Sequence, residues 1–450
     1  MPDSAEIATV ETMLAAWIEN RIGRVVRMER QARWRPCWVV DAERDGQIVP
    51  LFVKGSREVH AITPVKLEGA ALDVLYRNGI PAPRQYGHCE EIDAIVMERL
   101  PGESRLEKIE DPAIRDKVVD EYVQAMVKYH ALDPQLFVDA GFTIPSDPAH
   151  LRLAQYVPIE QMYLAKKRGP EAASEFLRLW LRRNVPTDDI RPSFIVGDSF
   201  QMMYHEGALK AVMDLEMATI GDPLLDLSCI RMRDLSEKTG DAAAITRRYA
   251  ELSGRPVDLK VLRFHLVVFS AVSSMLVSDV MSKPADDTDY LEYYIYYRGC
   301  LRLALEAQAE FLGLTLEPFT PPEPTRTAQS IHWQRLGLAI DQVPAESEID
   351  RYIRSKAMAE AEHLTRVDLY GAAFDRAYLD DVEKLLGARP KSVLDAEAKL
   401  EEFVHQAGPE SDEALMRLFH RRELQLAFLA DIPQNKRLQR FLMEPIAKLD

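Results

Sequence analysis

The chain has few cysteines, and they form no motif. Among its 450 residues the four cysteines are Cys37, Cys89, Cys229 and Cys300, and no Cys-x-x-Cys pair occurs. Structural zinc sites and disulfide frameworks both need clustered cysteines. The sequence therefore indicates neither of them, and it fits a reducing compartment, which we expect to be the cytoplasm.

A surplus of basic residues and a long apolar run are also missing. Lys and Arg number 56 against 72 Asp and Glu, which gives a net charge of −16. A nucleic-acid partner would need a basic surface that displaces counterions, so we expect none. The acidic N-terminus lacks the basic region of a signal peptide. The most apolar run, 264–277, is too short to span a bilayer and is interpreted as a buried helix, so we expect no membrane partner.

The composition is that of an ordinary globular protein, with 47% hydrophobic and 28% charged residues. The length predicts two or three domains. A proline-rich segment at 316–325 is the best boundary. Beyond it, 326–450 has helical periodicity and almost no strand signal. The helices that we expect there span 327–342, 346–386, 392–407, 411–430 and 433–448, and this all-α bundle either packs on the rest of the chain or mediates homo-oligomer formation.

The most informative stretch is 194–227, which contains two aspartates, each directly after an apolar run. Asp198 follows Phe194-Ile195-Val196-Gly197, and Asp214 follows Ala211-Val212-Met213. Between them, His205-Glu206-Gly207 separates two strand-like runs, which predicts a β-hairpin. A carboxylate that accepts a proton and a carboxylate that binds Mg²⁺ are what phosphoryl transfer needs. The alternative is that either aspartate is only a turn residue.

Three ordered motifs, at 196–198, 213–216 and 221–227, read Val-Gly-Asp, Met-Asp-Leu-Glu and Gly-Asp-Pro-Leu-Leu-Asp-Leu. In order and spacing they resemble the catalytic core of the aminoglycoside phosphotransferase-like kinases, a branch of the protein-kinase fold that includes choline kinases. The resemblance implies that Asp198 is the catalytic base and that Asp214 binds Mg²⁺.

The resemblance covers residues 24–312 and implies an α+β, bilobal, protein-kinase-like fold. Its small antiparallel β N-lobe is expected at 24–100, with strands at 24–30, 37–42 and 49–53. A mostly helical C-lobe is expected at 101–315. An N-terminal helix at 1–23 precedes both lobes, and 326–450 follows them.

By the same resemblance, the N-lobe binds the nucleotide. Lys54 ends the third strand and would hold the phosphates, with Glu68 on the next helix as its partner. The hinge between the lobes falls at Met97, Glu98 and Leu100. Backbone groups there would bind the purine, with Met97 against the ring, although Met97 fits equally well as plain core.

The sequence departs from the family in three places. The histidine of the Asp loop is Val196, and the metal-binding asparagine five residues after Asp198 is Met203, which cannot bind a hard cation such as Mg²⁺. Gln201 either replaces that asparagine as a metal ligand or only hydrogen-bonds the loop. The phosphate-covering loop at 31–36 has no glycine, so its backbone amides cannot approach the phosphates closely. Arg33 and Arg35 either reach the phosphates with their side chains or lie on the surface. We slightly favour the surface position.

We therefore expect an ATP-dependent, or GTP-dependent, phosphotransferase that uses Mg²⁺ and acts on a hydroxyl of a small molecule. The alternative is a non-catalytic kinase-like binding or scaffold protein that works through its C-terminal helices. The acceptor is open, with choline, homoserine, sugars and hydroxyacyl-CoA as examples. Arg178, Arg182 and Arg183 are either a solvated face or, if the acceptor is anionic, its ligands. His130 is interpreted as structural.

Overall fold

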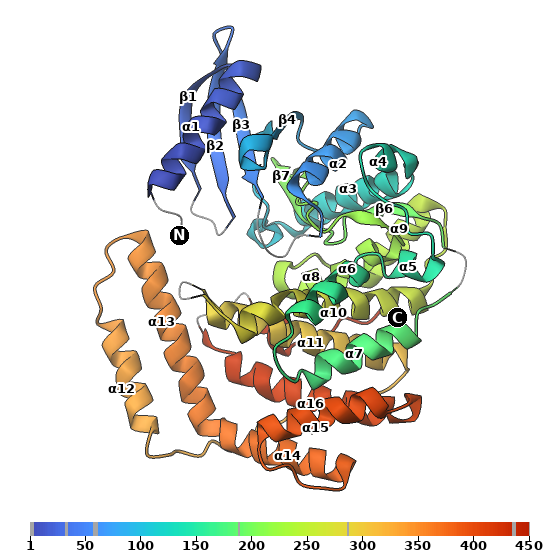
Figure 1. Ribbon diagram of the computed structural model, residues 1–450, viewed down its shortest axis with the longest axis vertical. Coiled ribbons are helices and arrows are strands. Elements are labelled where there is room, and N and C mark those ends of the chain that lie inside the picture. Colours follow the sequence, from blue (N-terminus) through green and yellow to red (C-terminus); the bar gives the residue numbers. More distant parts are fainter. Residues whose placement is uncertain are drawn as a thin grey trace.

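The computed structural model describes residues 4–31, 35–56, 62–187, 190–285, 288–433 and 438–449. A small lobe built on a β-sheet stands at one end of the molecule, and a larger helical body makes up the rest (Figure 1). The helical hairpin of α12 (Ser330–Asp341) and α13 (Glu348–Arg366) runs along one side of this body.

The N-lobe sheet has five antiparallel strands in the order β1-β2-β3-β5-β4. Their bounds are β1 (Arg24–Arg30), β2 (Cys37–Arg44), β3 (Gln47–Gly55), β4 (Gln85–Cys89) and β5 (Ala94–Glu98). The first three confirm the strands predicted from the sequence. The turn between β2 and β3 has φ of 53° at Asp45 and 75° at Gly46, a conformation that suits Asp-Gly and the twist of a hairpin.

Two helices complete the N-lobe. The predicted N-terminal helix is confirmed as α1 (Ser4–Arg21), whose Leu14, Trp17 and Ile18 are buried against sheet residues that include Val40 and Leu51. The helix predicted to carry Glu68 is confirmed as α2 (Val65–Arg77), between β3 and β4.

The C-lobe contains the predicted hairpin, formed by β7 (Met202–His205) and β8 (Ala208–Val212). A second, two-stranded pair, β6 (Ser193–Ile195) with β9 (Thr219–Gly221), brackets it in sequence. The two aspartates of the motif therefore lie on the two connections between these pairs. The described residues include short 3₁₀ turns at Glu90–Ile92, Leu106–Lys108 and Pro409–Ser411.

Nine helices are described in the C-lobe between residues 101 and 315: α3 (Pro112–His130), α4 (Gln135–Asp139), α5 (Pro148–Arg152), α6 (Tyr156–Lys166), α7 (Ala172–Arg183), α8 (Leu224–Glu237), α9 (Ala242–Ser253), α10 (Leu259–Ser282) and α11 (Tyr290–Phe311). The predicted buried helix is part of α10, which at 24 residues is longer than its apolar run and is long and apolar enough to span a membrane. Because 78% of its apolar window is buried inside the protein, α10 serves here as a core helix.

The C-terminal helices follow the prediction in part. Besides α12 and α13, they are α14 (Ala372–Leu386), α15 (Val393–Gln406), α16 (Asp412–Ala430) and α17 (Gln439–Met443). The helix predicted at 346–386 is confirmed as an unbroken run of helical residues from 348 to 386, in which a π-helical turn at Val367–Gly371 joins α13 to α14. The helix predicted at 433–448 is wrong beyond Met443, since 444–449 has no helical structure.

The helices beyond the proline-rich segment pack on the C-lobe. Tyr378, Leu400 and Phe419 belong to the same buried cluster as Trp180 and Leu305 of the C-lobe. Because such shared burial stabilises both parts together, the helices from α14 to α16 extend the C-lobe core. Their division into a separate domain at 316–325 stays a prediction.

The C-terminal residues return to the C-lobe in an extended conformation. The guanidinium of Arg231, which is 1% exposed, donates to the Ala447 carbonyl at 2.6 and 3.0 Å. Arg302 donates to the carbonyls of Phe441 and Glu444 at 2.9 and 3.0 Å. The helix ends here because the proline that follows Glu444 favours an extended conformation of that residue, which has φ of −79° and ψ of 136°. The buried arginines of α8 and α11 supply hydrogen-bond donors to the carbonyls of this tail.

Candidate active site

Backbone hydrogen bonds to a buried carboxylate hold the loop that carries Asp198. The N–H groups of Val196 and Gly197 donate to Asp226 at 2.8 and 2.7 Å. Gly197 has φ of 78°, and a Cβ atom there would lie 2.2 Å from the Met217 carbonyl oxygen. Only glycine meets both conditions, so the Gly-Asp pair sets the direction in which Asp198 leaves the strand.

Asp226 itself is fully buried at the start of α8. It also accepts a hydrogen bond from the Tyr129 hydroxyl at 2.9 Å and lies 3.2 Å from His130 Nε2. His130 Nδ1 lies 2.9 Å from the Tyr249 hydroxyl. The structural role predicted for His130 is confirmed, because both of its ring nitrogens have partners behind the loop.

Lys54, Glu68 and Asp214 form a cluster that joins the two lobes. Lys54 Nζ lies 2.6 Å from Glu68 Oε1 and 2.6 Å from Asp214 Oδ1, and the Leu215 N–H donates to Glu68 Oε1 at 3.0 Å. Burial would lower the pKa of Lys54, but the charges of Asp214 and Glu68 outweigh burial and raise it. The predicted pairing of Lys54 with Glu68 is thus confirmed, and the lysine stays protonated at neutral pH.

Arg35 lies in this cluster and not on the surface. Its side chain is only 8% exposed, its Nη2 lies 2.7 Å from Glu216 Oε2, and its Nη1 lies 3.9 Å from Asp214 Oδ1. The surface position that the sequence favoured for Arg35 is therefore wrong, because two acidic side chains draw this arginine inward. Arg33 lies outside the described residues.

Asp198 has two polar partners. The Gln201 amide donates to Asp198 Oδ2 at 2.8 Å, and Asp198 Oδ1 forms an ion pair with Arg233 Nη2 from α8. The hydrogen bond supports the loop-bonding role of Gln201, and a metal-binding role for its carbonyl oxygen stays a prediction. Arg233 was missed from the sequence. The sequence could have indicated Arg233 through its position, because it lies two helical turns after Asp226 and on the same face of α8.

The predicted hinge lies at the end of β5, with Met97 and Glu98 as the last two residues of the strand and Leu100 just beyond it. Met97 is 7% exposed, and the N–H of Glu98 donates to the Arg84 carbonyl at 2.8 Å. Arg99 donates to the Pro50 carbonyl at 3.0 Å. The N–H of Glu98 is therefore occupied, which leaves the Glu98 carbonyl and the backbone of Leu100 as the predicted contacts to a purine.

The acidic residues suit a magnesium ion that arrives with a nucleotide. Among the described residues no group of three or more His, Cys, Asp or Glu side chains could hold a metal. Asp214 is 28% exposed and Glu216 follows two residues later. Because Mg²⁺ usually binds to one or two carboxylates together with phosphates and water, this donor set fits Mg²⁺ bound to ATP or GTP and does not fit a permanent metal centre.

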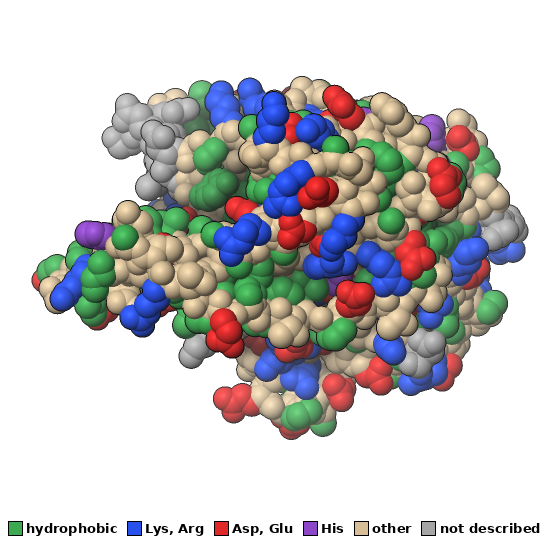
Figure 2. All heavy atoms as spheres, turned by 90° about the horizontal axis from the view of Figure 1, so that it is seen from below, with side chains coloured by type: hydrophobic (Ala, Val, Ile, Leu, Met, Phe, Trp, Pro, Cys, Tyr) green, Lys and Arg blue, Asp and Glu red, His purple; other side chains and the backbone are tan. Residues whose placement is uncertain are grey.

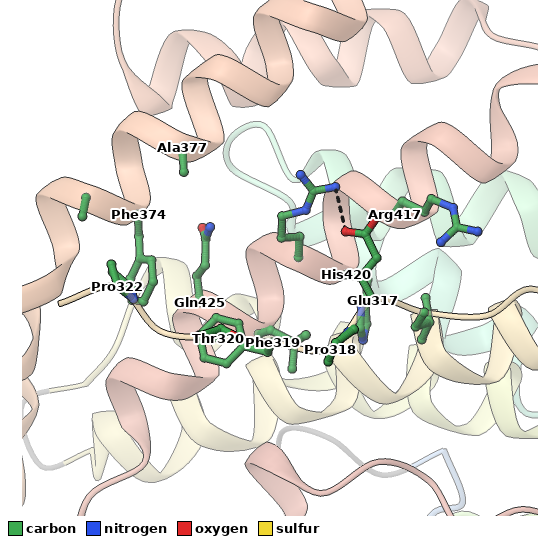
Figure 3. Close-up of a pocket in the computed structure, with 14 residues that line it drawn as sticks. Glu317, Pro318, Phe319, Thr320, Pro322, Phe374, Ala377, Arg417, His420 and Gln425 are labelled. Atoms are coloured by element: carbon green, nitrogen blue, oxygen red, sulfur yellow. Dashed lines mark ion pairs between the residues drawn. The ribbon is translucent and has the colours of Figure 1, made fainter.

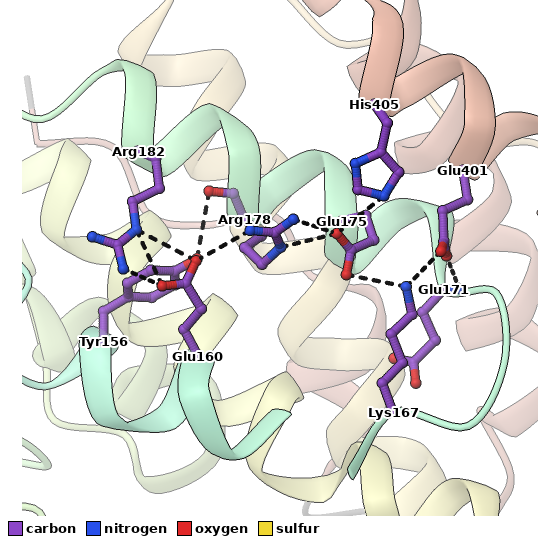
Figure 4. A network of polar contacts seen from close by, with 9 residues as sticks. All are labelled: Tyr156, Glu160, Lys167, Glu171, Glu175, Arg178, Arg182, Glu401 and His405. Carbon is purple, nitrogen blue, oxygen red and sulfur yellow. Dashed lines mark hydrogen bonds and ion pairs between the residues drawn. The ribbon is translucent and has the colours of Figure 1, made fainter. Parts of the chain in front are cut away.

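The three arginines of α7 are paired with acidic residues (Figure 4). Arg178 and Arg182 both pair with Glu160 of α6, and Arg178 Nη2 also lies 2.7 Å from Glu175. Arg183 Nη2 lies 2.5 Å from Asp412 of α16. These ion pairs stabilise the packing of the C-lobe and its C-terminal helices. Arg182 and Arg183 are exposed, as expected for a solvated face, whereas Arg178 is half-buried. A role of the three arginines in binding an anionic acceptor stays a prediction.

A pocket of the described structure lies away from these residues. It has a volume of about 360 Å³ and lies between the proline-rich segment and helices α14 and α16, with Phe319, Phe374 and His420 in its wall (Figure 3). These helices lie at the opposite end of the molecule from the sheet (Figure 1), and on that end hydrophobic side chains show among charged ones (Figure 2). None of the predicted site residues lines this pocket.

The model of a family described as "Phosphotransferase enzyme family" matches residues 34–263. No curated protein matches the chain. A solved structure of a putative aminoglycoside phosphotransferase from Ralstonia eutropha JMP134 is 18% identical, covers 67% of this chain and 98% of its own, and has a TM-score of 0.53.

Two further solved structures are similar to the chain at lower TM-scores. Macrolide 2'-phosphotransferase MphH from Brachybacterium faecium is 18% identical, covers 61% of this chain and 99% of its own, and has a TM-score of 0.43. A thermostable mutant of aminoglycoside phosphotransferase APH(4)-Ia, in ternary complex with AMP-PNP and hygromycin B, is 15% identical, covers 65% and 98%, and has a TM-score of 0.45. The Ralstonia structure confirms the predicted bilobal fold.

Proposed function

Because the chain belongs to the phosphotransferase enzyme family, we propose that it transfers the γ-phosphoryl group of ATP to a hydroxyl group of a small molecule. The observation that carries the proposal is the cluster of Lys54, Glu68 and Asp214. It brings together a lysine from β3, a glutamate from α2 and an aspartate from the loop after β8, with 2.6 Å between Lys54 Nζ and each carboxylate. Asp198 lies on the loop before the same hairpin.

Each of these residues has a role that its surroundings support. Lys54, kept charged by its two acidic neighbours, would bind the phosphates of the nucleotide. Asp214, with Glu216, would hold Mg²⁺, which when bound supplies positive charge against the phosphate oxygens. Glu68 is a positioning residue, because its carboxylate holds both the lysine and the N–H of Leu215.

Asp198 would orient the acceptor hydroxyl and take its proton. In the transfer, the bond between the γ-phosphorus and the oxygen that bridges it to the β-phosphate breaks, and its electron pair leaves with ADP. A new bond forms between that phosphorus and the acceptor oxygen. The hydrogen bonds from Val196 and Gly197 to Asp226 fix the loop, which supports such a role because orientation supplies much of the catalysis in phosphoryl transfer.

The test is calorimetric titration of the purified protein with ATP, and separately with GTP, in the presence and absence of Mg²⁺. Asp214→Asn is measured beside Asp120→Asn, which changes a partly exposed carboxylate that pairs with Arg248 on the C-lobe surface. We expect Mg²⁺-dependent binding that Asp214→Asn weakens at least about tenfold, since it removes a metal ligand, and that Asp120→Asn leaves unchanged.

Two results would contradict the proposal in different ways. Equal, Mg²⁺-independent binding by both variants would show that Asp214 holds no metal. Absence of ATP and GTP binding would reject the phosphoryl-transfer mechanism and leave the non-catalytic alternative. If ATP binds, Asp198→Asn should retain that affinity and lose ATP hydrolysis, in which water replaces the acceptor.

A further inference from the structure

The carboxylate proposed as the base is paired with a buried arginine. Arg233 Nη2 contacts Asp198 Oδ1, and Arg233 Nη1 lies 2.8 Å from Glu237 Oε1 one turn further along α8. The Arg233 side chain is 17% exposed. Two acidic partners thus fix the plane of the guanidinium group directly beside the carboxylate that would receive the acceptor proton.

The pairing leaves donor capacity unused. Guanidinium has five N–H groups, and in the described structure the Nε atom of Arg233 is buried without a hydrogen-bond partner. Asp198 Oδ1 likewise lacks a hydrogen bond of good geometry, although it is close to the arginine. Buried donors without acceptors are rare in native proteins, and each one calls for an explanation such as a catalytic role or a bound water or ion.

Arg233 keeps its positive charge in the folded protein. Burial by itself would lower the pKa of the guanidinium, but the negative charges of Asp198 and Glu237 outweigh burial and raise the pKa further above its ordinary range. A permanent cation therefore stands beside Asp198 throughout the pH range in which the protein is folded.

The site needs such a cation. Phosphoryl transfer places negative charge on three oxygens, which positive groups must stabilise. This chain has no glycine in the loop at 31–36 to offer backbone amides, and it has Met203 in place of an asparagine oxygen for the metal. Arginine binds phosphate oxygens with two parallel hydrogen bonds. Arg233 can therefore supply positive charge and N–H donors to a phosphoryl group in a site that lacks these two features.

We propose that Arg233 binds an oxygen of the phosphoryl group beside Asp198, as a catalytic residue supplied by α8. The proposal rests on the proposed function, because it requires that a phosphoryl group reaches Asp198. That group has two sources with the same oxyanion chemistry: the phosphoryl still leaving the nucleotide, and the phosphate on the acceptor side after transfer.

The experiment measures thermal stabilisation and calorimetric affinity with three probes, each in Mg²⁺: ADP alone, ADP with aluminium fluoride, and ADP with inorganic phosphate. Aluminium fluoride stands in for the phosphoryl in transit, and inorganic phosphate for the group after transfer. The wild type is compared with Arg233→Gln and with Arg233→Lys. The lysine keeps the positive charge but lacks the two parallel N–H groups of the guanidinium. Arg248→Gln is the control, because it breaks another Arg–Asp pair of the C-lobe, with Asp120.

We expect Arg233→Gln to bind ADP with the affinity of the wild type. In the wild type, aluminium fluoride or phosphate should increase the affinity for ADP, and we expect this increase to be at least tenfold smaller in Arg233→Gln. Arg233→Lys should lose part of it and Arg248→Gln none. Loss with aluminium fluoride alone assigns the contact to the phosphoryl in transit, and loss with phosphate alone assigns it to the acceptor side.

Full tightening in both Arg233 variants would overturn the proposal, and so would a wild type that binds ADP without any tightening. If the wild type does not bind ADP at all, the proposed function itself fails and this proposal fails with it. If Arg233→Gln does not fold, Arg233→Lys tests the proposal by itself. Lysine keeps the positive charge for the ion pair with Asp198, but it cannot offer two parallel N–H groups.

Discussion

Replacing Asp226 with asparagine tests how the loop before Asp198 is held. The fully buried carboxylate accepts hydrogen bonds on both oxygens: Oδ1 from the Gly197 N–H at 2.7 Å, and Oδ2 from the Val196 N–H at 2.8 Å and the Tyr129 hydroxyl at 2.9 Å. Asparagine keeps the shape but turns one acceptor into a donor. We expect its oxygen to face the two donors of the Oδ2 side, so that its NH₂ group faces the Gly197 N–H.

The cost follows from these contacts. One hydrogen bond to a charged acceptor contributes about 1.5–3 kcal/mol, and a buried donor left without an acceptor costs about 1–3 kcal/mol. Together they predict that Asp226→Asn lowers the free energy of unfolding by about 2.5–6 kcal/mol. Native proteins are stable by only about 5–15 kcal/mol, so the variant should fold but with a much smaller margin.

Urea unfolding at 25 °C, followed by tryptophan fluorescence and by circular dichroism, measures this difference. Asp120→Asn serves as control, because its carboxylate is 36% exposed and pairs with Arg248 in solvent; it should change the free energy of unfolding by less than about 1 kcal/mol. A loss below about 1 kcal/mol for Asp226→Asn would refute the reasoning, since it would mean that the Gly197 N–H finds an acceptor elsewhere.

Three further predictions concern the backbone at Gly197, the C-terminal residues 445–450 and the affinity for Mg²⁺. Gly197→Ala should destabilise by at least about 2 kcal/mol more than Gly79→Ala in the same assay, because both glycines have positive φ but only the first lies against a carbonyl; equal losses would contradict the clash. Removal of residues 445–450 should cost about 1–3 kcal/mol, because Arg231 loses the carbonyl that it binds, and an unchanged melting temperature would refute this. Met203→Asn should tighten Mg²⁺ binding in the presence of AMP-PNP several-fold, roughly the effect of one added oxygen ligand, and calorimetry that shows no change would mean that this position does not face the metal.

Much of the kinase-like part could be predicted from the sequence, because its signals are local. The β-hairpin at 201–213 depends on turn chemistry within a few residues, and it is confirmed. The pairing of Lys54 with Glu68 came from order and spacing that resemble a known family, and it is confirmed at 2.6 Å. Their roles in catalysis, like those of Asp198, remain proposals.

Only the tertiary structure decided the partners of several charged side chains. Arg35 was expected on the surface and Arg233 was not considered, yet both lie in the site, because acidic groups distant in sequence compensate their burial. The early end of the last helix, in contrast, has a local cause, because Pro445 favours an extended conformation of Glu444. Local propensity determined where helices and strands could form, whereas buried charges were placed by neighbours that only the folded chain brings together.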